Sequence, residues 1–95
     1  MNKIDISFAS KALIKGGIYL YLKHDALQYV FACQKEDIPI LGIDAFYITQ
    51  KSTQPSMEHS IDFSTHLIDK STFAEATKFL EGMPDSLYFE IVTAD

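Results

Sequence analysis

The stretch I-L-G-I-D-A-F-Y-I-T, residues 40–49, decides the fold. Apolar residues stand at both alternating sets of its positions, and it is rich in β-branched and aromatic side chains. This pattern predicts a central strand with both faces buried. Residues 51–56 are polar and include Pro55, so a hairpin loop is expected there, with residues 59–64 as the returning strand. That strand should place His59, Ile61 and Phe63 on one face and Ser60 and Asp62 on the other.

One helix is expected before this hairpin and another after it. The first covers residues 25–36, with Asp25 as its N-cap, and Pro39 ends it. The second begins at the capping box of Thr72 and Glu75 and stops at Gly82, which Pro84 follows. Residues 87–93 then form a closing strand.

The N-terminal segment shows a period of two. Ile4, Ile6 and Phe8 alternate with polar residues, which predicts a strand over residues 3–8. A helical turn over residues 10–15 is expected to end at Gly16 and Gly17, where the chain changes direction. Residues 18–22 have the aromatic content of a strand, with a short buried helix as the alternative.

These elements predict a single α+β domain, residues 1–95. It consists of a mostly antiparallel sheet of four to five strands with two main helices packed on one face. A split βαβ topology is one arrangement that fits. Cys33 is the only cysteine, which excludes a disulfide scaffold, and 47% apolar residues exclude a disordered chain. No apolar run approaches the roughly 18 residues of a membrane span, and the first ten residues lack a signal-peptide core, so we expect a soluble, cytoplasmic protein that does not bind membranes.

The net charge of −5 is distributed unevenly along the chain. Residues 1–48 hold five lysines and five acids, whereas residues 49–95 hold three lysines and eight acids. All eight basic residues are lysines, and the absence of arginine argues against nucleic-acid binding. An acidic half either attracts a basic partner or only keeps the domain soluble.

Several polar residues are candidates for a site. Asp44 lies inside an apolar strand, so it is either a binding or catalytic acid or a residue paired with a neighbouring hydroxyl or lysine. Glu58, His59, Asp62 and His66 are the densest group of possible ligands, but their spacing does not match a zinc site. Cys33 has the setting of a buried small hydrophobe. We expect no catalytic residue, no metal and no cofactor.

Tyrosines are the other candidates. Tyr47 on the central strand, together with Tyr19 and Tyr21, can anchor an interface because each ring offers a large contact area and a polar tip. The alternative for each is ordinary packing in the core or at its boundary.

The stretch from His24 to Phe63 resembles a known family. The helix D-A-L-Q-Y-V-F-A-C-Q-K-E (25–36) leads into I-P-I-L-G-I-D-A-F-Y-I (38–48), and a polar loop separates this from E-H-S-I-D-F (58–63). This order, with its hydrophobic-Gly-x-Asp step, is similar to the small α+β immunity proteins of bacterial polymorphic toxin and contact-dependent growth inhibition systems. The final helix and strand extend the resemblance loosely.

The resemblance implies a protein that is not an enzyme. An immunity protein binds its cognate toxin, often a basic nuclease, and occludes the active site or the substrate groove. The candidate partner-binding residues are Asp44, Tyr47, Glu58, His59 and Asp62. The carboxylates would supply charge and Tyr47 an anchoring ring, and Asp44 and Asp62 are expected near one another on the hairpin, although the sequence leaves the strand register open. A monomer is favoured.

Two other functions fit the same residues. One is a small ligand-binding or enzymatic subunit with its site around Asp44, Tyr47 and His59, which requires a concave pocket. The other is a self-associating structural domain, because apolar strands have edges that need covering.

Overall fold

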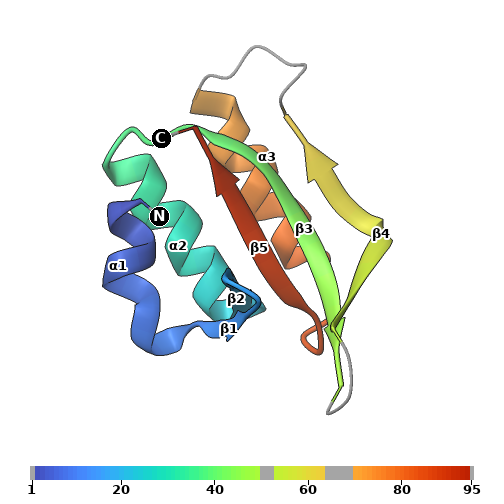
Figure 1. Cartoon of the computed structure of the whole chain (residues 1–95). Helices are drawn as coiled ribbons and strands as arrows, with labels where there is room; N and C mark the ends of the chain where they lie inside the picture. Colours follow the sequence, from blue (N-terminus) through green and yellow to red (C-terminus); the bar gives the residue numbers. More distant parts are fainter. Residues whose placement is uncertain (1, 50–52, 64–69, 95) are drawn as a thin grey trace.

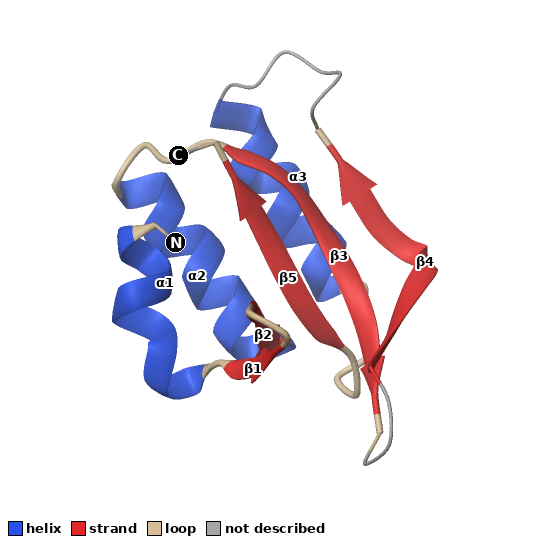
Figure 2. Ribbon diagram, in the orientation of Figure 1, coloured by secondary structure: helices blue, strands red, loops and turns tan. Residues whose placement is uncertain are grey.

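The computed structural model describes residues 2–49, 53–63 and 70–94, which form one antiparallel sheet and its helices (Figures 1 and 2). The sheet has five strands in the order β1-β2-β5-β3-β4. This confirms the predicted α+β class. The strands are β1 (Leu13–Lys15), β2 (Ile18–Leu22), β3 (Ile40–Ile48), β4 (Thr53–Asp62) and β5 (Tyr88–Thr93), and the helices are α1 (Lys3–Phe8), the 3-10 turn η1 (Ala9–Lys11), α2 (Lys23–Lys35) and α3 (Lys70–Glu81).

The connections form two interlocked split βαβ units. Strand β5 lies between β2 and β3, which α2 connects, and β3 lies between β4 and β5, which α3 connects. Neighbouring strands are antiparallel, so the two strands joined by each helix run parallel to one another. Helix α3 lies behind β3 and β5 in Figure 1, which leaves the front of the sheet uncovered there. None of the helices in the described part of the chain is long and apolar enough to cross a bilayer.

The main core lies between the sheet and the helices. The sheet contributes Ile43, Ala45, Phe89 and Ile91, all buried in one hydrophobic cluster with α2 and α3. Because the strands alternate, the residues between these positions face away from the core. The helices complete the cluster with Ala26, Tyr29, Val30 and Cys33 from α2 and Phe73, Ala76 and Leu80 from α3.

The N-terminal strand predicted for residues 3–8 is wrong, because this segment is the helix α1. The side chain of Asn2 caps it by accepting a 2.7 Å hydrogen bond from the backbone N–H of Asp5. Ile4 is buried and Phe8 is partly buried against the core, four positions apart, while Ile6 is 64% exposed. Ile4 and Phe8 fit the four-residue spacing of a helix face as well as the alternation of a strand. The cap formed by Asn2 favours the helix.

Helix α2 begins at Lys23, so Asp25 lies in its first turn and is not the predicted N-cap. The helical turn predicted for residues 10–15 is wrong over its second half, because η1 ends at Lys11 and Leu13–Lys15 form β1. Gly16 and Gly17 both have positive φ and form the turn of the β1–β2 hairpin, so the change of direction predicted at the paired glycines is confirmed. The residues predicted as a loop, 51–56, include the start of β4 at Thr53, and Pro55 fits there because β4 is the outermost described strand. Thr72 is a buried residue inside α3 and not its N-cap, because α3 begins at Lys70.

A polar network joins α1 to α2 and the sheet. The carboxylate of Asp5 accepts hydrogen bonds from the hydroxyls of Tyr21, at 3.0 Å, and Tyr29, at 2.9 Å. Asn2 donates from Nδ2 to the Tyr29 hydroxyl, at 3.0 Å, and to Thr93 Oγ1, at 2.7 Å. The network therefore holds the N-terminal helix against the end of β5.

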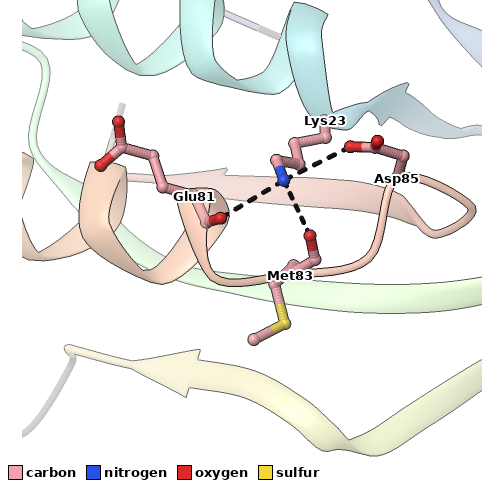
Figure 3. A network of polar contacts seen from close by, with 4 residues as sticks. All are labelled: Lys23, Glu81, Met83 and Asp85. Atoms are coloured by element: carbon pink, nitrogen blue, oxygen red, sulfur yellow. Dashed lines mark hydrogen bonds and ion pairs between the residues drawn. The ribbon is translucent and has the colours of Figure 1, made fainter.

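Lys23 joins the start of α2 to the end of α3 (Figure 3). Its Nζ donates to the carbonyl oxygens of Glu81, at 3.3 Å, and Met83, at 2.9 Å, and lies 3.3 Å from Asp85 Oδ1. A helix C-terminus leaves carbonyls without intrahelical partners, and a cation is favourable there. Lys23 thus fixes the chain just before it enters β5.

Candidate protein-binding surface

We call the uncovered side of the sheet the open face, formed by the positions that alternate with the core residues. Two rows of paired positions define its centre: Asp44 pairs with Glu90 and Ser60, and Gly42 pairs with Val92 and Asp62. A third row pairs Phe46 with Tyr88, which also pairs with Leu22. The open face therefore has an acidic part beside an apolar part.

Glu90 and Asp44 occupy directly opposite positions on β5 and β3. Burial raises the pKa of the Glu90 carboxyl above its ordinary value, and the negative charge of Asp44, followed by that of Asp5, raises it further. Asp44 is exposed and Glu90 is half-buried, and among the described residues neither carboxylate forms an ion pair. Like charges on directly opposite positions are destabilising. This surface therefore carries a repulsion that an added cation would relieve.

An open hollow of about 370 Å³ lies next to this pair. Asp44, Ser60 and Asp62 supply its polar atoms, and Val92, which is 38% exposed, supplies apolar surface. Gly42 also lines the hollow. A β-carbon at this position would come 2.8 Å from the carbonyl oxygen of Ile61. The close approach of β3 and β4 thus requires glycine and leaves the surface low between Asp62 and Val92. Leu41 and Ile61 complete the lining.

The structure brings Asp44 and Asp62 together, as expected for the hairpin. Both are exposed, both line the hollow, and their strand positions lie one pair apart on the same face. The register that the sequence left open is Asp44 with Ser60 and Gly42 with Asp62.

The other predicted site residues lie apart from this pair. Tyr47 is 47% exposed and pairs with Gln54 at the far end of β3, three positions from Asp44 and so on the opposite side of the strand. His59 is half-buried in an irregular part of β4, where the register jumps between Ser56 and Ser60. Glu58 belongs to the same irregularity, and its side chain lies outside the described residues, as does His66. Asp44, Tyr47 and His59 therefore do not line one pocket.

Sequence reasoning missed Glu90 and Val92. The alternation of Phe89 and Ile91 with Glu90 and Val92 already indicated which residues of this strand leave the core. It did not indicate that β5 lies beside β3, because strand order depends on long-range pairing.

The chemistry of this surface is limited to charge, hydroxyl and apolar contact. Among the described residues, no group of three or more His, Cys, Asp or Glu is placed to hold a metal ion. Cys33 is buried in the core. The surface can attract and hold a basic protein group.

Comparison with known proteins gives no match: no family model, curated protein or solved structure is similar to this chain.

Proposed function

We propose that this protein is an immunity protein that binds a basic bacterial toxin domain through the open face and blocks its active site or substrate groove. One observation supports this most: carboxylates of β3, β4 and β5 gather on an uncovered sheet face, with Asp44 and Glu90 directly opposite one another. A positively charged group on a partner would be attracted to both carboxylates and would offset the repulsion between them. Charge complementarity of this kind increases association rates and excludes wrong partners.

The apolar row beside the acids supports a protein partner over a free ion. Leu22 is 40% exposed, and Tyr88, paired with it, is half-buried. Specific protein interfaces combine apolar contact area with polar groups that fix orientation. The open face has both, because Tyr88 lies between Leu22, which offers apolar contact area, and Glu90, which offers a charged group.

The function is tested by protection of cells. The C-terminal domain of the protein encoded immediately upstream of this chain's gene, as the candidate toxin, is expressed in a sensitive bacterium, with and without this protein. Survival with the wild-type protein, and death with a vector alone, are the expected results. Death in both cultures, with the protein present at normal levels, would refute the immunity function.

The site is tested by the salt dependence of binding to the same domain. Asp44→Lys and Asp62→Lys should each lower the association rate about tenfold at low salt and much less at about 0.5 M salt, because screening removes long-range attraction. Glu58→Lys belongs to the same series. Glu81→Lys, an equal change of charge at the end of α3, is the control and should have a smaller effect. Equal binding by wild type and all sheet variants at low salt would exclude the open face as the site.

A further inference from the structure

A second surface lies at the outer edge of the described sheet, between β4 and α3. It contains a groove of about 400 Å³ with an apolar floor formed by Ile61, Phe63 and Phe79. Glu75 and Lys78 flank this floor from α3, and both are exposed. The groove thus has one acid and one base on its rim, whereas the charged residues described on the open face are acids.

The strand beside the groove has one edge that pairs with no other strand in the described part of the chain. Strand β4 has β3 on one side and ends the described sheet on the other. The N–H of Phe63 donates to the carbonyl of Leu41 at 2.7 Å, so Phe63 and Ile61 direct their backbone groups toward β3. In an antiparallel ladder the alternate position, Ser60, then directs its N–H and C=O groups to the outer edge. Such an edge is a template for another strand.

We propose that a second copy of this chain docks on this edge, with β4 pairing antiparallel to β4 of the partner and the two α3 helices side by side. A two-fold axis places the same surface on both partners, so each residue must find its complement on the same patch. With the axis passing between positions 75 and 78 of the two α3 helices, Glu75 faces Lys78 of the other copy, twice. The two grooves then cover each other's apolar floor, and the sheet continues through both subunits.

This dimer leaves the open face accessible, because edge pairing extends a sheet without covering its faces. It therefore does not depend on the toxin. The sequence alone favours a monomer, so the proposal departs from that expectation and oligomeric state decides between them.

The test is sedimentation velocity of the full chain over concentrations up to about 1 mM, the weak end of specific association. The wild type should pass from monomer to dimer as concentration rises. Glu75→Lys and Lys78→Glu should each weaken the dimer at least about tenfold, because each places like charges opposite one another across the axis. Circular dichroism of both variants establishes that they remain folded.

Charge exchange gives the decisive controls. An equal mixture of the Glu75→Lys chain and the Lys78→Glu chain should form a heterodimer, since both cross-axis pairs are then opposite in charge. The double variant Glu75→Lys/Lys78→Glu should dimerise like the wild type. A wild type that is monomeric at every concentration, single variants that dimerise normally, or a mixture that stays monomeric would overturn the proposal.

Discussion

At the residue scale, the aromatic hydroxyls around Asp5 connect sequence to stability. Tyr29 is fully buried, and its hydroxyl both donates to Asp5 and accepts from Asn2. Phe8 packs edge-on against the ring at a centroid distance of 5.7 Å. Burial is the main cause that raises the pKa of Tyr29, so the hydroxyl stays protonated and continues to donate. We conclude that this one side chain fixes α1 on α2.

Tyr29→Phe is therefore expected to destabilise the protein by about 1–3 kcal/mol, because it removes a partner from the buried amide of Asn2. Urea unfolding measures the change. Tyr47→Phe is the matched control, since its ring is 47% exposed, and should change the free energy of unfolding by less than about 0.5 kcal/mol. Equal midpoints for the two variants would show that the network does not stabilise α1.

Removing the charge of Glu90, unlike removing the Tyr29 hydroxyl, is expected to stabilise the protein at neutral pH. Its pKa is raised in the folded protein, so folding favours the neutral carboxyl. The stability associated with this group is fully present below its ordinary pKa of 4.5 and is lost as the pH rises through the raised folded value. At pH 7 the charged form is therefore unfavourable in the fold, which is acceptable if the residue serves binding.

Glu90→Gln should consequently unfold at a higher temperature than the wild type at pH 7, and the difference should shrink as the pH falls below about 4, where the carboxyl is neutral in both states. The same variant should bind the toxin domain more weakly. Thermal unfolding across this pH range tests the first part. A variant that is less stable than the wild type at pH 7 would mean that Glu90 has a stabilising role instead.

At the element scale, the contact between β3 and β4 depends on Gly42. A β-carbon at this position would lie 2.8 Å from the carbonyl oxygen of Ile61, which is backbone and cannot move away without displacing the strand. The hairpin that carries Asp44 and Asp62 is thus held close by the absence of a side chain.

Gly42→Ala should destabilise the protein by about 1–3 kcal/mol, because the strands must separate to accept the methyl group. Gly82→Ala is the control: its β-carbon would meet its nearest neighbours at 3.7 Å, an ordinary contact. Chemical denaturation of both variants provides the comparison. If Gly42→Ala proves as stable as Gly82→Ala, the close approach of the strands is not what selects glycine.

Some of these elements could be predicted from the sequence, whereas others could not. The pattern of residues 40–49 predicted β3 correctly, and Gly82 with Pro84 placed the end of α3, because both signals are local. The strand predicted for residues 3–8 was wrong, because the spacing of Ile4 and Phe8 fits both the alternation of a strand and the four-residue spacing of a helix face. Glu90 lies in the candidate site because β5 pairs with β3, which the sequence did not predict. Tyr47 lies outside the site because side chains alternate along β3 and its own is on the opposite side from Asp44. Local signals fix elements, while the site depends on which strands become neighbours.

At the scale of the whole molecule, two surfaces divide the sheet. The open face carries carboxylates from β3, β4 and β5, and the edge of β4 carries an apolar groove with one acid and one base. The helices cover the remaining side of the sheet and bury the core. A partner on the open face and a second copy at the edge can therefore be bound together, since neither covers the other.

Backbone amide NMR locates the surface at which the proposed toxin domain binds. Titrating the ¹⁵N-labelled protein with the proposed toxin domain should shift or broaden the amides of Gly42, Asp44, Ser60, Glu90 and Val92. Amides on the outer side of α2, such as Gln28 and Phe31, should change little. Perturbations confined to the helices, with the open face unchanged in the bound protein, would contradict the account.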